Sequence, residues 1–427
     1  MSSSVEWGRC PRLPHFLCAI SIIGASVGLG DVPKINADYT TDQQIKLYES
    51  WIQKDPSSIA DKILLAGAYI QKTRETTDFG YLQRASKILD QVLAVKQDNE
   101  ALHMRSVVEL TLHHFSKAAE FAGAMVAKSP GDWQSWGTLG DAQMEMGNYD
   151  AGRAAFERML ALKPGLASYN RIGFYHFVTG DTEAGIKYLR DAAKASAQFP
   201  ENKAWCLVDL GNMYFKTGRM DDAEAAYREA IAAFPASHSA HAALGSVLAA
   251  RGKLEDAVTS YKRAQSITPM VQYAGALYDL YTALGKKELA KEQAGLVDIT
   301  AQLEEAAGQK ANRTLALIFA NQDRNLAKSL ELAQADFEIR KDVYTHDALA
   351  WAFFKNRRFE EAKAHSEEAR KLKTPEPLFH FHAGMIEQAV GNREAARAEL
   401  DKALALNSNF DFQLAAIARQ TLQGIGH

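Results

Sequence analysis

Apolar residues recur along most of the chain with the spacing of amphipathic helices. Between Ala223 and Ile231, for example, they fall at i, i+3, i+4, i+7 and i+8, which places them on one face of an α-helix. No run shows strand-like alternation supported by β-branched residues. Polar turns separate many short segments of this kind, so the pattern predicts an all-α protein.

A small residue, alanine or glycine, recurs in every second predicted helix at intervals of about 34 residues. A side chain this small lets a neighbouring helix approach closely. The series is Ala118, Gly152, Gly185, Ala223, Ala257, Ala290, Ala327, Ala362 and Ala396. The turns before these helices carry glycines that can end a helix in the left-handed conformation, at Gly147, Gly180, Gly218, Gly252, Gly285 and Gly391.

The best copies of the pattern read Leu210-Gly211, Tyr214, Gly218, Ala223, Tyr227, Ala230 and Pro235, and then Leu244-Gly245, Leu248, Gly252, Ala257, Tyr261, Ala264 and Pro269. This succession resembles the tetratricopeptide repeat, a helix–turn–helix unit. The resemblance implies a right-handed α-solenoid superhelix of about nine repeats, with degenerate helices at its N-terminal end.

The register of the repeat predicts where each first helix begins and which repeats are irregular. The predicted starts are Asn99, Trp133, Leu166, Ala204, His238, Val271, Gly308, Val343 and Pro377. Position 8 of the repeat is small in most copies, but it is Tyr278 and Leu315 in two of them, so we expect those two repeats to be distorted.

Two breaks in the pattern divide the chain into segments. After Ala290 the second helix continues to Ala307, and the polar stretch Gly308–Asn312 follows, which indicates a seam. We therefore expect a leader at 1–37, degenerate helices at 38–98, a first array at 99–307 and a second array at 308–427. The second array resembles repeats of exported bacterial tetratricopeptide proteins.

The N-terminal segment has the features of a secretory signal peptide. Arg9 and Arg12 precede an apolar run from Phe16 to Gly30 that contains small residues. This run is shorter than the ~20 residues of a bilayer-spanning helix. It favours a cleaved leader, and hence a periplasmic or secreted protein without an integral membrane span in the mature chain. The alternative is anchoring by an uncleaved N-terminal segment.

Composition and motifs exclude several classes of function. The net charge of −3 gives no electrostatic reason to expect nucleic-acid binding. No nucleophile elbow, phosphate loop or zinc-protease motif is present, so we expect no catalytic residue, no cofactor, no metal and no enzymatic activity. His238 and His241 could share a helix face and bind a metal, but polar residues are routine at this point of the repeat.

In the family that the chain resembles, ligands lie in the concave groove lined by first-helix positions 2, 5, 9, 12 and 13. Carried over by register, this rule gives a peptide-binding groove that contains Asn170, Phe174, Phe177, Trp205, Asn212, Phe215, Lys216, Tyr344 and Trp351. Rings would supply contact area and amides would hold a peptide backbone. The alternative is that the aromatic residues only pack against the next repeat.

Three functions remain open from the sequence. The first is a non-enzymatic scaffold that binds a protein or peptide partner in its groove, in the periplasm or outside the cell. The second is an adaptor subunit of an envelope assembly or export complex, acting through repeat–repeat contacts. The third, an enzyme with a site between the two arrays, rests only on the seam near Gly308.

Overall fold

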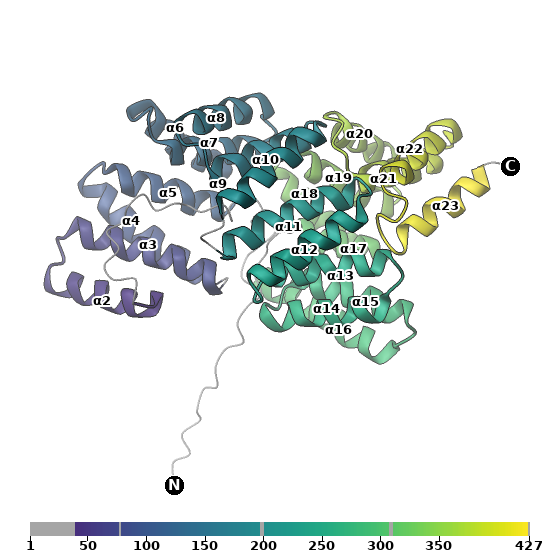
Figure 1. Ribbon diagram of the computed structural model, residues 1–427, viewed down its shortest axis with the longest axis horizontal. Helices are drawn as coiled ribbons and strands as arrows, with labels where there is room; N and C mark the ends of the chain where they lie inside the picture. The colour runs from purple at the N-terminus through teal and green to yellow at the C-terminus, as the bar shows by residue number, and fades with distance from the viewer. Residues whose placement is uncertain (1–38, 77, 197–199, 307–310, 426–427) are drawn as a thin grey trace, which may run out of the picture.

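The computed structural model describes residues 39–76, 78–196, 200–306 and 311–425. Within these ranges the chain forms 22 α-helices and no strand. Successive helices pack side by side in a curved row, as Figure 1 shows. The predicted all-α solenoid is thus confirmed. The predicted leader, and residues 307–310 of the predicted seam, lie outside the described residues.

Three helices precede the repeats: α2 (Thr41–Lys54), α3 (Ile59–Thr76) and α4 (Gly80–Val95). Their buried residues form one core that continues into the next helix through Met104 and Val108. They therefore cover the apolar surface that the first array would otherwise expose at its end.

The first array consists of six helix pairs. Their bounds are α5 (Asn99–Thr111) with α6 (Phe115–Lys128), α7 (Trp133–Glu145) with α8 (Tyr149–Leu162), α9 (Leu166–Val178) with α10 (Thr182–Ala195), α11 (Pro200–Lys216) with α12 (Met220–Ala233), α13 (His238–Ala250) with α14 (Leu254–Ile267), and α15 (Val271–Ala283) with α16 (Lys287–Ala306).

The second array has three pairs and a final helix. They are α17 (Arg313–Asn321) with α18 (Leu326–Ile339), α19 (Val343–Lys355) with α20 (Phe359–Arg370), α21 (Pro377–Ala389) with α22 (Arg393–Leu406), and α23 (Leu414–Ile425).

Seven of the nine first helices begin at the residue that the repeat register predicts. The exceptions are α11, which begins at Pro200, and α17, which begins at Arg313. The two repeats expected to be distorted are irregular in helix length, because α16 runs for 20 residues and α17 for only 9. A large residue at position 8 thus coincides with the places where the standard repeat is interrupted.

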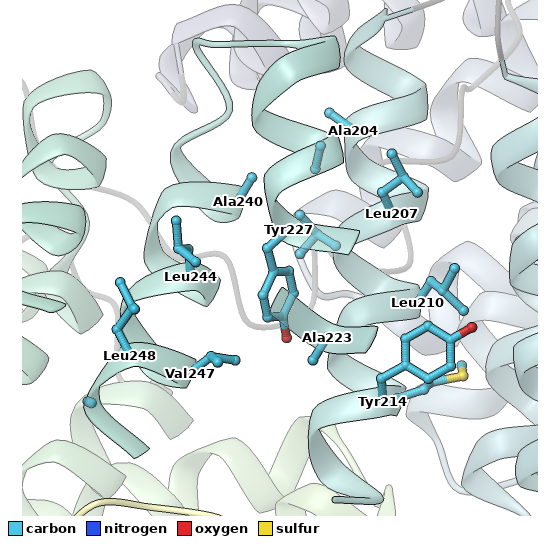
Figure 2. Packing of buried hydrophobic residues seen from close by; sticks show 14 of the residues in the cluster. Ala204, Leu207, Leu210, Tyr214, Ala223, Tyr227, Ala240, Leu244, Val247 and Leu248 are labelled. Atoms are coloured by element: carbon cyan, nitrogen blue, oxygen red, sulfur yellow. The ribbon is translucent and has the colours of Figure 1, made fainter. Parts of the chain in front are cut away.

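Close packing at the small positions holds each helix pair together. Figure 2 shows Tyr227 of α12 in the space between α11 and α13, with Ala223 beside it. The ring lies so close to Gly211 that a Cβ atom there would be 2.4 Å from Cε1 of Tyr227. Ala223 is fully buried. A larger side chain at either small position would push the helices apart.

The turns within the repeats adopt the left-handed conformation predicted for them. All six turn glycines have φ between 70° and 88°. Three repeats lack this glycine, and there His113, Asp323 and Arg357 adopt positive φ instead. The turn geometry is therefore kept even where the residue type departs from the pattern.

The two arrays meet because the solenoid curves back on itself. Turns of the first array contact loops or helix ends of the second array at three levels. Gly147 approaches Lys341, Gly180 approaches Lys373, and Gly218 approaches Leu406. The hydrogen bonds at these levels join residues 192 to 196 positions apart in sequence, or about six repeats.

Much of this interface uses backbone groups of the first array. The backbone N–H of Lys341 donates to the carbonyl of Glu145, at 2.9 Å. The Thr374 hydroxyl donates to the carbonyl of Val178, at 2.5 Å, and the Asn407 amide to the carbonyl of Phe215, at 2.6 Å. Each of these loops therefore donates a hydrogen bond to a carbonyl in the last turn of a first-array helix.

A buried ion pair reinforces the first level of the interface. Nε of Arg340 donates to Oε2 of Glu145 at 2.9 Å, and Nη1 donates to Asp336 at 2.6 Å. The same guanidinium lies 5.2 Å from the ring centroid of Phe115. Because the side chains of Arg340 and Glu145 are at most 8% exposed, loss of Arg340 would leave Glu145 buried without its basic partner.

Candidate ligand-binding cavity between the two arrays

Helices α9 and α11 present aromatic and polar side chains to the space enclosed by the two arrays. On α9, Asn170, Phe174 and Phe177 follow at i, i+4 and i+7, which aligns them on one face. On α11, Asp209, Asn212 and Lys216 are aligned in the same way. The small positions already described hold α11 against α12, so this face has a fixed orientation.

Helices α19 and α21 form the opposite side. Asp342 caps α19, because its carboxylate accepts from the backbone N–H groups of Tyr344 and Thr345. Pro377 begins α21, where its missing N–H leaves no unpaired donor, and Glu376 immediately precedes it. These helix starts place Tyr344 and Glu376 opposite α11.

A cavity of about 390 Å³ lies between these helices. This volume is at the lower end of the range typical of small-ligand pockets. Most of the lining is apolar or aromatic, and it includes Phe174, Phe177, Phe215, Phe379 and Phe410. Its polar groups come from both arrays, so the cavity exists only because the solenoid closes.

Lys216 connects the two sides of the cavity. Its Nζ lies 2.6 Å from Oε2 of Glu376 and 3.4 Å from the hydroxyl of Tyr344. Burial alone would lower the pKa of Lys216, but the charge of Glu376 and its hydrogen bond outweigh burial and raise that pKa. Lys216 therefore carries its positive charge inside the cavity at every physiological pH.

Asp209 lies in a different environment on the same helix face. Its Oδ2 accepts a hydrogen bond of 3.1 Å from the amide of Asn170. Burial raises the pKa of Asp209 to about 7, although the Asn170 amide and the charge of Lys216 oppose the shift. The carboxyl thus changes its ionisation near neutral pH.

Asn212, the third polar residue of this face, is oriented by α12. The hydroxyl of Tyr227 donates to Oδ1 of Asn212 at 2.8 Å. Asn212 is also one of the residues that line the cavity. The ring that packs on Gly211 therefore also fixes a polar group of the cavity.

The cavity brings together seven of the nine residues proposed for the groove. They are Asn170, Phe174, Phe177, Asn212, Phe215, Lys216 and Tyr344. The other two, Trp205 and Trp351, are not among its lining residues. Trp205 packs beside Met159 and Ala167 at the opposite end of α11.

Trp351 is held in the packing of the second array. It is 3% exposed, and its Nε1 donates to Oδ1 of Asn321 at 2.7 Å. Its ring stacks on His382, with 4.1 Å between the centroids. The alternative open from the sequence, packing against neighbouring repeats, is what the structure shows for this tryptophan.

Several residues that line the cavity are not at the groove positions from which the sequence prediction was made. Asp209 is at repeat position 6, outside the groove positions of the family, but it follows the helix face shared by Asn212 and Lys216. That helical spacing was the one signal that could have revealed it. Glu376, Phe379 and Phe410 enter only through closure of the solenoid, which leaves no local pattern in the sequence.

Three sequence models, each described as a tetratricopeptide repeat, match residues 134–165, 166–236 and 208–269. These matches span α7 to α14. The chain is a tetratricopeptide repeat protein. Both helices that supply the inner face of the cavity, α9 and α11, therefore belong to tetratricopeptide repeats. No match to a curated protein was found.

Several solved structures are similar to this tetratricopeptide repeat protein. PilW, a widely conserved type IV pilus biogenesis factor, is 19% identical, covers 52% of this chain and 99% of its own, and has a TM-score of 0.41. MamA is 21% identical over 38% of this chain and 93% of its own, with a TM-score of 0.32. A chain of the APC/C hetero-tetramer Cut9–Hcn1 is 11% identical over 91% and 94%, with a TM-score of 0.34. These low values contribute nothing to the assignment of function.

None of the helices in the described part of the chain combines the length and hydropathy needed to cross a bilayer. Within the same residues, no three or more His, Cys, Asp or Glu side chains are grouped so that they could hold a metal ion. His238 and His241 have separate partners, the Tyr273 hydroxyl and the Pro235 carbonyl.

Proposed function

We propose that this tetratricopeptide repeat protein is a non-enzymatic scaffold that binds a peptide segment of a partner protein in the cavity between its arrays. The observation that carries this proposal is the convergence of Asn170, Phe174, Asn212 and Phe215 on one cavity. Aromatic rings offer contact area, and side-chain amides offer hydrogen bonds to a peptide backbone.

The chemistry of the lining favours binding over catalysis. Among the described residues that line the cavity there is no serine, threonine, cysteine or histidine. Serine, threonine and cysteine nucleophiles, and histidine as an acid–base group, are thus missing from this lining. The cavity does contain the amides and aromatic rings that suit a peptide.

The location that we propose is the periplasm or the outside of the cell. It rests on the basic flank and the short apolar run near the N-terminus of the sequence. Sequencing the N-terminus of the mature protein from an envelope fraction tests it. Cleavage after the apolar run supports the proposal, and an uncleaved protein found only in the cytoplasm contradicts it.

Selection from a displayed library of random peptides tests the peptide-binding role. The wild-type protein should enrich specific peptides, and Phe174→Ala with Phe215→Ala should weaken their binding about 10-fold or more. The matched control is Trp205→Ala, which removes an aromatic side chain from α11 outside the cavity. Retention of binding by the Phe174 and Phe215 variants, or equal losses in the control, would contradict the proposal.

A second candidate function is an adaptor that binds through the outer surface of the repeats. The observation in its favour is an exposed apolar stripe on α16, where Leu296 is 46% exposed and Ile299 is 53% exposed. Leu296→Glu with Ile299→Glu should then abolish crosslinking to the partner in the native envelope. Under the cavity proposal, these changes leave the partner bound.

A further inference from the structure

Five carboxyl groups line the cavity, and four of them have a basic partner close by. The four pairs are Glu376 with Lys216 at 2.6 Å, Asp342 with Arg313 at 3.0 Å, Glu145 with Arg340 at 2.9 Å, and Asp347 with His382 at 3.0 Å. The fifth carboxyl belongs to Asp209. Among the described residues, its one hydrogen bond comes from the neutral amide of Asn170.

The cavity already shows how it holds a cation. The ammonium group of Lys216 pairs with Glu376 and lies 5.0 Å from the ring centroid of Tyr344 and 5.6 Å from that of Phe177. A carboxylate and nearby aromatic faces are the groups that stabilise an ammonium or guanidinium ion away from water.

Asp209 is the lining carboxyl that has no salt bridge among the described residues. Phe174 follows Asn170 by one turn of α9, and Asn170 is bonded to the carboxyl of Asp209. Both Phe174 and Asp209 line the cavity. An ionised carboxylate in an apolar cavity is unfavourable unless a counter-ion neutralises it. A ligand that brings a positive charge supplies this counter-ion.

We propose that the cavity takes a basic side chain, a lysine or arginine of the bound peptide, with Asp209 as its counter-ion. This inference rests on the proposed peptide-binding function and specifies its ligand. The aliphatic stem of the basic residue would lie along the phenylalanine rings of the lining, and its charged end would reach the Asp209 carboxylate.

The ionisation of Asp209 gives the proposal a signature in pH. Burial raises the pKa of Asp209 to about 7, so the carboxylate is present mainly above that pH. Cys206 and Tyr227 also interact with Asp209, but burial raises the pKa of both groups, so they stay neutral near pH 7. Lys216, on the same helix, remains charged throughout this range.

From the opposite side, the charged residues that face the cavity are Glu376, Asp342, Asp347 and Arg313. Glu145 also lines it, and burial raises the pKa of this carboxyl to about 7. The effect of Asp209 is therefore measured as the difference in affinity for a cationic ligand between the wild type and Asp209→Asn at each pH. This difference should grow as the pH rises from 6 to 8, because the ionised carboxylate binds the cation.

Three probes of equal chain length test the charge preference: hexylammonium, hexanol and hexanoate, each titrated calorimetrically into the full-length protein. At pH 8 we expect hexylammonium to bind about 10-fold more tightly than hexanol, which corresponds to about 1.4 kcal/mol. Asp209→Asn should abolish this preference. Asp221→Asn, at an exposed carboxylate of α12, is the matched control and should preserve it.

Equal binding of hexylammonium and hexanol overturns the inference, and so does a preference that persists in Asp209→Asn. Absence of hexylammonium binding at millimolar concentration overturns it too. The peptide selection separates this result from the broader proposal. Enriched peptides without lysine or arginine contradict the basic side chain but support peptide binding, whereas an ammonium preference without any enriched peptide contradicts the peptide-binding function.

Discussion

Alanine substitutions at Gly218 and Gly252 allow the effect of the contact between the arrays on stability to be separated from the effect of backbone strain in the turn. Both residues lie in the turn after the first helix of a repeat, and both have φ of 76°. At Gly218 an added Cβ atom would lie 2.7 Å from the carbonyl oxygen of Leu406 in the second array, whereas at Gly252 nothing lies within 4 Å. Alanine therefore meets the same backbone strain at both positions but a steric clash at only one.

The structure gives the size of the expected difference. Alanine in the left-handed conformation costs about 1–2 kcal/mol, and this part is common to both variants. At Gly218 the C-terminal end of α22 must also move by about 0.7 Å to restore ordinary contact at 3.4 Å, which is overpacking worth about 1–3 kcal/mol. Gly218→Ala should thus lose about 2–5 kcal/mol, against about 1–2 kcal/mol for Gly252→Ala.

Urea unfolding followed by tryptophan fluorescence measures the loss of stability, and small-angle X-ray scattering measures closure. We expect a lower unfolding midpoint and a larger radius of gyration for Gly218→Ala than for Gly252→Ala. Combining Gly147→Ala, Gly180→Ala and Gly218→Ala should open the structure further. If Gly218→Ala and Gly252→Ala were equally destabilised and equally compact, the contact between the arrays would not exist in solution.

Three other predictions concern the core, the buried ion pair and the histidines. Ala223→Leu should lower the free energy of unfolding by about 1–3 kcal/mol through overpacking of α11 against α12, and an unchanged denaturant midpoint would contradict the repeat register. Arg340→Met should cost about 3–5 kcal/mol, because it leaves Glu145 buried and unpaired, and adding Glu145→Met should recover part of the loss in the same unfolding assay. Burial and the neighbouring His365 lower the pKa of His346 to about 4. The neutral side chain of His346 therefore stabilises the fold above about pH 6.5, the pKa of an unfolded histidine, and this stabilisation is lost as the pH falls towards 4. Thermal unfolding between pH 7 and pH 4 should therefore depend less on pH in His346→Gln than in the wild type.

The repeat pattern predicted the local structure well, because helix starts and turns depend on nearby residues. Gly147 and Gly252 could both be assigned to left-handed turns from sequence alone. That Gly147 contacts the second array and Gly252 does not could not be predicted. The contact involves backbone carbonyls such as those of Val178 and Phe215. Because every residue has a backbone carbonyl, the residue type does not indicate such a contact.

The candidate site was predictable as far as it depends on helix register. Phe174 and Phe215 face the cavity because they occupy groove positions of the repeat. Register alone could not tell that Trp351 would pack against His382, since both environments suit an aromatic side chain. Asp209 was missed because it lies at repeat position 6, outside the groove positions of the family, although its spacing from Asn212 and Lys216 places it on the same helix face.

Closure of the solenoid also changes how the protein should resist unfolding. An open repeat array behaves like a linear chain of neighbours that melts inward from its free ends. Here hydrogen bonds such as the one between Thr374 and Val178 link the two arrays. The helices between the linked residues can separate only after those hydrogen bonds break. Helices α2–α4 precede Glu145, the first residue that is hydrogen-bonded to the second array, so they should unfold like the free end of an open array. Amide hydrogens should therefore exchange at graded rates through α2–α4 and at a common slow rate from α7 to α21, so that part of the molecule would act as one cooperative unit.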